Sequence, residues 1–111
     1  MNLHLDLVNE TTIFLQYNKL TTIHLDAFEG CPNLRFLALH GNQIETLPDI
    51  SYLTQLEFLD LSCNNLSTLN PCHLPRHLVV LKLHSNPFTT RNASDKYEYR
   101  RPFVLELPEL D

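Results

Sequence analysis

One residue type recurs along the chain at nearly equal intervals. Asparagines stand at Asn18, Asn42, Asn64 and Asn86, separated by 24, 22 and 22 residues. Each asparagine follows two apolar residues, five and three positions earlier, and precedes another apolar residue by two positions. A period between about 20 and 50 residues is typical of repeat proteins, in which one unit cannot bury its apolar face alone and neighbouring units stack. The spacing therefore predicts four stacked units of similar shape.

The residues before each asparagine have the alternation of a short strand. In the second unit, Leu37 and Leu39 are predicted to point inward, whereas Phe36 points outward. A buried asparagine amide at the end of such a strand can donate to and accept from backbone groups of the turn that follows. The four asparagines are therefore expected to form a ladder along the stack.

Two segments match a known repeat pattern. Residues 34–44 and 56–66 fulfil Leu-x-x-Leu-x-Leu-x-x-Asn-x-Leu/Ile at every position. In these segments the chain resembles the leucine-rich repeat family. The resemblance implies an α/β solenoid, a short right-handed coil of about four rungs with a parallel sheet on its concave face and a cap at each end. On this basis the chain is one domain, with a capping strand over 1–10, four repeats over 11–88, and a loop and carboxy-terminal cap over 89–111.

The amino-terminal end differs from the repeats. Leu3, Leu5 and Leu7 alternate with polar residues, but too few residues separate them from Ile13 for a full turn of the coil. Residues 1–10 are therefore expected to pair as a strand beside the Ile13 rung, for example as a hairpin, and to cover that edge of the sheet.

The carboxy-terminal segment 99–110 resembles the cap of intracellular leucine-rich repeat proteins, which carry Tyr-Arg, a hydrophobic helix and Leu-Pro-x-Leu. Pro102 departs from that pattern, because proline suits only the first turn of a helix. The sequence stops at Asp111, before the closing Leu-Asp strand that the pattern leads one to expect. This end indicates either a truncated cap or a partner over the last apolar edge.

The composition argues against several other classes. Only 2 glycines are present, whereas phosphate and dinucleotide loops need several close together. The net charge of −5 provides no basic surface for nucleic acid. No apolar run reaches the length of about 18 residues that crosses a bilayer, and the first residues lack a basic and apolar leader. We therefore expect a cytoplasmic protein without nucleic-acid or membrane partners.

The cysteines also favour a reducing compartment. There are 3 of them, an odd number, and no pair has the Cys-x-x-Cys spacing of a zinc or redox motif. A secreted protein remains an alternative because the chain contains Asn-x-Ser/Thr sequons, which are glycosylated in the secretory pathway. Such triplets begin at Asn9, Asn65 and Asn92.

The sequence offers no arrangement typical of catalysis or metal binding. His40 and His84 share the same outward position, but the rung of Ser62 lies between them. Two strand spacings, about 9.6 Å, are too wide for one ion with nitrogen ligands at about 2 Å. No Gly-x-Ser-x-Gly elbow or cofactor motif occurs. The expected protein is not an enzyme and uses no metal, cofactor or small-molecule substrate.

The outward face of the strands is the candidate binding surface. Phe36 and Phe58 share one position on it, and exposed aromatic side chains often mark protein-binding patches. The alternative is that the two rings only stack on each other as a cross-strand pair. The carboxylates of Glu57 and Asp60 are expected to be solvated beside Lys82. The candidate residues are Phe14, Arg35, Phe36, His40, Glu57, Phe58, Asp60, Val80, Lys82 and His84.

The predicted face is small. Four strands about 4.8 Å apart and about 17 Å long present a few hundred square ångströms, against about 800 Å² per partner in a standard interface. An edge or an end of the coil is therefore expected to share the contact with a protein partner.

The family resemblance implies a non-enzymatic adaptor or structural subunit of a larger intracellular assembly. Leucine-rich repeat proteins with such repeats and a Tyr-Arg cap include ciliary proteins, phosphatase regulators and a spliceosomal component. By family association alone, the resemblance favours a ciliary, axonemal or cytoskeletal assembly. A module that binds a protein phosphatase and a secreted recognition domain are the two alternatives.

Overall fold

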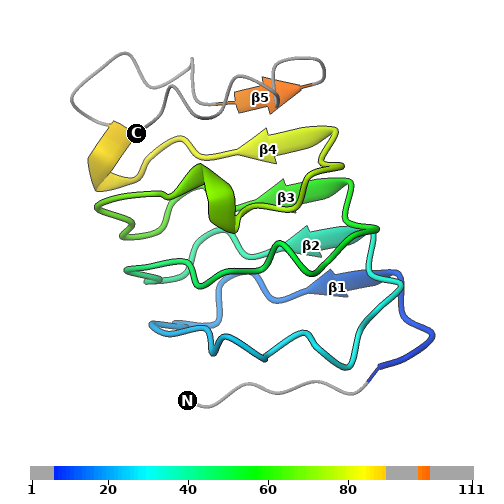
Figure 1. The fold of residues 1–111 in the computed structure, drawn as a ribbon. Helices are drawn as coiled ribbons and strands as arrows, with labels where there is room; N and C mark the ends of the chain where they lie inside the picture. Colours follow the sequence, from blue (N-terminus) through cyan, green and yellow to red (C-terminus); the bar gives the residue numbers. More distant parts are fainter. Residues whose placement is uncertain (1–6, 90–97, 101–111) are drawn as a thin grey trace.

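The chain forms a coil of stacked rungs with one strand in each rung (Figure 1). The computed structural model describes residues 7–89 and the backbone of residues 98–100. Its five strands are β1 (Thr12–Phe14), β2 (Phe36–Ala38), β3 (Phe58–Asp60), β4 (Val80–Lys82) and β5 (Glu98–Arg100). The described residues contain no α-helix and two short 3-10 helices, η1 (Pro71–His73) and η2 (Pro87–Thr89).

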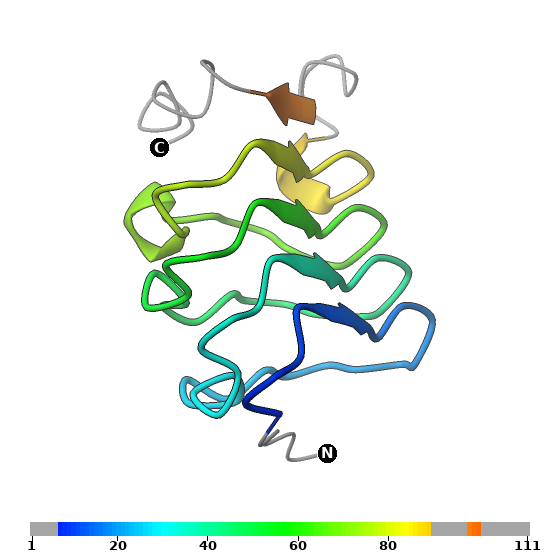
Figure 2. The same cartoon turned by 90° about the vertical axis from the view of Figure 1, so that its right-hand side faces the viewer.

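The strands lie side by side in the order β1-β2-β3-β4-β5, and the first four are parallel (Figure 2). Thr12 pairs with Phe36, Phe36 with Phe58, and Phe58 with Val80. This is the register that the asparagine spacing predicts. The short leucine-rich repeat solenoid is therefore confirmed.

The described part of the carboxy-terminal region is a strand. β5 pairs antiparallel with β4, so that Leu81 lies opposite Tyr99, and it covers the last edge of the parallel sheet. The cap helix that the resemblance implies after Tyr-Arg falls within residues 101–111, which lie outside the described residues.

The amino-terminal prediction falls mainly on residues 1–6, which also lie outside the described residues. Residues 7–10 form a turn, closed by a hydrogen bond of 3.1 Å from the Glu10 amide to the Leu7 carbonyl. The Leu7 amide donates to the carbonyl of Gly30 at 3.0 Å, and the Asn33 side chain donates to the carbonyl of Val8. These residues are therefore tied to the return limb of the first rung.

The core lies between the strands and the return limbs that run back across the coil. The leucines in β2, β3 and β4, and the leucine two positions after each of them, point inward and are fully buried. Most apolar residues of the limbs are buried as well. Burial of each such side chain contributes about 1.5–3 kcal/mol relative to exposure. Fully buried examples are Phe28, Leu34, Leu37, Leu39, Ile44, Ile50, Leu53, Leu56, Leu59, Leu61, Leu66 and Leu78.

The asparagine ladder joins each rung to the one before it. The side-chain oxygen of Asn42 accepts from the Leu20 amide at 3.0 Å, and that of Asn64 accepts from the Ile44 amide at 3.1 Å. The Asn64 amide group donates to the carbonyls of Leu39 and Leu61, both at 3.0 Å. One side chain therefore satisfies backbone groups of two rungs. Asn86 bonds in the same way to Leu66, Leu61 and Leu83.

The residue before each ladder asparagine has a left-handed backbone. Tyr17, Gly41, Cys63 and Ser85 have φ values of 58°, 71°, 56° and 61°. A non-glycine residue pays about 1–2 kcal/mol for this conformation. Gly41 has a second reason to be glycine, because a Cβ atom there would overlap the ring of Tyr17.

The return limbs are also joined to one another. The Tyr52 hydroxyl accepts from the Phe28 amide at 3.1 Å, and the Ile50 amide donates to the His73 carbonyl at 2.9 Å. Burial raises the pKa of the Tyr52 phenol, with smaller contributions from nearby acidic groups, although the bond from Phe28 opposes the shift. These bonds connect limbs of successive rungs, and one of them ends on His73 of η1.

The ladder generates a prediction about stability. Asn64→Ala should lower the free energy of unfolding by about 2–3 kcal/mol, because the buried Ile44 amide loses its acceptor. Asn18 corrects the expectation of four buried ladder side chains, because its side chain is exposed and, among the described residues, donates only to Leu15 and Gln16 of its own rung. It is therefore the matched control. Asn18→Ala should cost less than about 1 kcal/mol. Urea unfolding would measure both losses, and equal losses would contradict the ladder account.

The Tyr52 contact generates a prediction about alkaline pH. A raised pKa in the folded state means that the neutral phenol contributes stability below its unfolded pKa, and that this contribution is lost as pH rises through the folded pKa. Tyr52→Phe should cost about 1 kcal/mol at neutral pH because the Phe28 amide loses its acceptor. The difference in unfolding free energy between the two proteins should shrink from about pH 8 to about pH 11. A constant difference over that range would refute the assignment.

Candidate protein-binding surface

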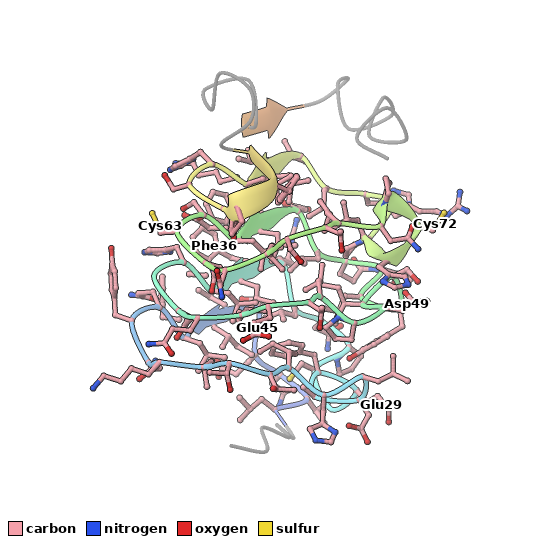
Figure 3. The ribbon with its side chains drawn as sticks, turned by 90° about the vertical axis from the view of Figure 1, so that its left-hand side faces the viewer. Glu29, Phe36, Glu45, Asp49, Cys63 and Cys72 are labelled. Atoms are coloured by element: carbon pink, nitrogen blue, oxygen red, sulfur yellow. The ribbon has the colours of Figure 1, made fainter. Side chains whose placement is uncertain are left out.

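The outward side chains of β1 to β4 and of the residues next to them form one surface, here called the strand face. Figure 2 shows these strands side by side, and Figure 3 views the molecule from the opposite side, with the return limbs in front. The sequence predicted ten binding residues on this face, and the parallel register brings them together across neighbouring strands.

Three aromatic rings, here called the aromatic row, cross the strand face. The ring centroids of Phe14 and Phe36 are 5.5 Å apart, and those of Phe36 and Phe58 are 4.1 Å apart with nearly parallel planes. Phe14 is 64% exposed, whereas Phe36 and Phe58 are half-buried. The cross-strand stack that the sequence left as an alternative is therefore present, and the row still offers ring surface to solvent.

An ion pair lies where β2 and β3 begin. Arg35 Nη2 donates to Glu57 Oε2 at 2.8 Å, and both side chains are about half exposed. An exposed pair of this kind contributes at most about 1 kcal/mol to stability. Its main effect is to place both charges at the rim of the aromatic row.

Asp60 is buried, which corrects the sequence-based expectation of a solvated carboxylate. It is only 8% exposed, and its Oδ1 atom accepts from the Ser62 amide at 3.0 Å and from the Ser62 hydroxyl at 2.6 Å. The carboxylate folds back onto the residue two positions later, as aspartate does in local turns. His40 Nδ1 lies 3.3 Å from the other oxygen, Oδ2. Asp60, Ser62 and His40 are here called the polar cluster.

Two residues of this region were not among the predicted site residues. Tyr17 is 72% exposed and its ring meets that of His40 edge-on, with centroids 5.2 Å apart. Ser62 holds Asp60 in place. The spacing Asp-x-Ser could have predicted this local bond, and Asp49 and Ser51 have the same spacing on a return limb. There the bonds from Ser51, first of all from its hydroxyl, lower the pKa of the Asp49 carboxyl.

The remaining predicted residues lie beside these groups. Val80, Lys82 and His84 are half-buried, and Lys82 pairs in register with Asp60. The Ser62 carbonyl accepts from Gly41 and the His84 carbonyl accepts from Cys63, which places the Ser62 rung between the two histidine rungs.

Neither the histidines nor the cysteines assemble a metal site in the described part of the chain. Across residues 7–89, no group of three or more His, Cys, Asp or Glu side chains is placed to hold an ion. Cys63 and Cys72 lie at opposite sides of the coil (Figure 3), and none of the three cysteines forms a disulfide bond. In the same described residues, no helix is long and apolar enough to cross a membrane.

The polar cluster generates a prediction. Asp60→Ala should lower the free energy of unfolding by about 2–3 kcal/mol, because the buried Ser62 amide and hydroxyl both lose their acceptor. Asp60→Asn keeps an oxygen for Ser62 and should cost about 1 kcal/mol or less. Thermal or urea unfolding of the two variants compares them. A larger loss in Asp60→Asn than in Asp60→Ala would contradict the geometry.

Comparisons with known proteins support the repeat fold. Two leucine rich repeat family profiles match residues 4–44 and 55–76, together more than half of the chain. Leucine-rich repeats generally mediate protein–protein interaction and typically lack enzymatic activity.

Several curated proteins are similar in sequence. Mouse podocan is 45% identical over 85 residues, which cover 73% of this chain and 14% of podocan. P-granule-associated novel protein 1 of Caenorhabditis elegans is 39% identical over 109 residues, 89% of this chain and 17% of that protein. Human PH domain leucine-rich repeat-containing protein phosphatase 1 is 37% identical over 76 residues, 68% of this chain and 4% of that protein.

The chain thus spans less than a quarter of the length of each of these relatives. The two family profiles span Asn18, Asn42 and Asn64 of the repeats described above. The rung geometry, the asparagine ladder and the family matches together show that the chain belongs to the leucine-rich repeat family.

Proposed function

We propose that this chain is a protein-interaction module that binds a partner protein through the strand face. The observation that carries the proposal is the aromatic row, whose three rings stand in contact on the side of the sheet opposite the core. Rigid rings lose little conformational entropy when a partner covers them, and aromatic side chains dominate many interface energies.

The surroundings of the row suit an interface. The rings lie between the Arg35 and Glu57 ion pair at one rim and the polar cluster at the other. Interfaces commonly combine an apolar centre with a polar rim that sets orientation. In this proposal the module acts as an adaptor or structural subunit, and the partner supplies contacts beyond the small face.

The test removes the centre of the row. In affinity capture from native cells, Phe36→Ser with Phe58→Ser should lower recovery of the partner by about tenfold or more, because truncated interface anchors cost on the order of 2 kcal/mol each. The matched control is Leu25→Ser, which removes an apolar side chain that is 61% exposed on a return limb. Quantitative mass spectrometry compares the three proteins.

Circular dichroism must show that each variant is folded before capture is compared. Partners lost by the double variant but retained by Leu25→Ser support the strand face. An identical set of captured proteins for wild type and the folded double variant would refute it.

A second candidate is a module that works with a protein phosphatase. The similarity to the leucine-rich repeat-containing protein phosphatase favours this candidate. Phosphatase activity should then co-purify with the captured wild-type chain and be lost with the Phe36→Ser and Phe58→Ser variant. Capture of partners without phosphatase activity would refute this second candidate and would leave the adaptor role as the remaining one.

The cellular setting is part of the proposal. Family association with intracellular leucine-rich repeat proteins favours a ciliary, axonemal or cytoskeletal assembly. The exposed sequon asparagines Asn9 and Asn65 favour a secreted recognition domain as the competitor. Microscopy of the endogenously tagged protein, with a deglycosylation shift on electrophoresis, distinguishes the two settings.

A further inference from the structure

Exposed apolar side chains gather at one end of the coil. Of the seven large apolar residues that are exposed in the described part of the chain, five belong to residues 7–25. These five are Leu7, Val8, Phe14, Tyr17 and Leu25. β1 is the outermost parallel strand of the described sheet, so this end of the stack consists of the first rung and residues 7–10 before it (Figure 1). Such a concentration of apolar surface is typical of an interaction site.

The first rung is apolar where later rungs are not. Phe14 pairs in register with Ala38, and the same position holds Asp60 in β3 and Lys82 in β4. Tyr17 stands where later rungs carry Gly41, Cys63 and Ser85 before the ladder asparagine. The repeat pattern does not require an apolar residue at either position. Phe14 and Tyr17 are therefore features of the first rung alone.

The backbone of β1 has a second edge. Thr11 accepts from Arg35 and Phe36, and the Leu15 amide donates to Ala38, so these positions face β2. Backbone groups alternate in direction along a strand, and therefore Thr12 and Phe14 direct their N–H and C=O groups away from β2. Neither residue has a hydrogen-bond partner on that side among the described residues.

The ladder also ends open at this rung. The side-chain oxygens of Asn42, Asn64 and Asn86 each accept an amide from the rung before. That of Asn18 accepts no hydrogen bond from the described residues, and the side chain is exposed. On the side of β1 that faces away from β2, the groups that bond successive rungs therefore have no partner among the described residues.

The opposite end of the sheet shows how such an edge can be covered. β5 pairs with β4 antiparallel, although β1 to β4 are parallel. An antiparallel strand is therefore compatible with the end of this sheet. A twofold axis beside an edge strand makes that strand antiparallel to its own copy.

We propose that a second copy of this chain pairs with the first through β1, antiparallel, about a twofold axis beside Ile13. Thr12 of each copy then lies opposite Phe14 of the other, and the two residues exchange both backbone hydrogen bonds. The four backbone groups of β1 that face away from β2 are all satisfied in each copy. The exposed ring of Phe14 in each copy then lies beside Thr12 of the other copy.

The symmetry fits the residues at the centre. Ile13 points into the core and lies between the two edge-facing residues, so the axis brings the two Ile13 side chains together and joins the two cores. The outward side chains of both copies remain on one side of a continuous sheet. The dimer therefore doubles the strand face, which a single chain offers only in small area.

The test measures the oligomeric state of the full chain across a wide concentration range by analytical ultracentrifugation. Wild type should form a dimer. Thr12→Pro removes an edge-facing N–H at a position where proline is tolerated, and it should raise the dimer dissociation constant by about tenfold or more. Thr12→Val keeps the N–H and is the matched control, with an unchanged or lower dissociation constant.

A second variant acts on the side chain. Phe14→Lys places charges at the edge of each copy and should also weaken the dimer, while the fold is maintained because Phe14 is mostly exposed. Circular dichroism of each variant confirms folding. Amide exchange by NMR should show that Thr12 and Phe14 become protected as wild-type concentration rises.

Three results would overturn the proposal. One is a wild-type monomer at every concentration, and another is a dimer that both Thr12→Pro and Phe14→Lys leave unchanged. The third is protection of the Thr12 and Phe14 amides in a monomer, because the chain's own amino-terminal residues would then cover the edge. None of these results affects the proposed role of the strand face, which is tested with Phe36 and Phe58.

Discussion

The fold depends on one interaction, the double use of a buried asparagine side chain. At the end of each strand the chain turns sharply and leaves amide and carbonyl groups inside the coil. Asn64 accepts from Ile44 of the preceding rung and donates to Leu39 and Leu61 on both rungs. A buried backbone group without a partner costs on the order of 1–3 kcal/mol, so a shorter or apolar side chain cannot replace the amide.

The ladder also sets the geometry of the outward face. Because each rung is held at the same height relative to its neighbour, Phe36 and Phe58 meet with centroids 4.1 Å apart and nearly parallel planes. The stacking is thus a consequence of register and not a separate folding element. The same register places Asp60 beside Lys82 and brings His40 to the Asp60 carboxylate. A binding face of defined shape follows from repeated backbone contacts.

Much of the fold could be predicted from the repeat sequence. The inward direction of Leu37 and Leu39, the parallel register and the ladder role of Asn42 all follow from spacing, because alternation and stacking leave little choice. The candidate face was readable too, since positions between buried leucines must point outward. Exposure was harder to predict. Asp60 is outward but buried, because a local bond to Ser62 draws its carboxylate back to the sheet.

The sequence by itself determined the unit, its period and the face on which each side chain lies, because these depend on local alternation and on the asparagine at each turn. Only the tertiary structure decided how the units end and which outward groups touch. β5 reverses direction to cover β4, and Tyr17 reaches across the turn to His40. Both depend on contacts between residues distant along the chain, for which a local repeat carries no signal.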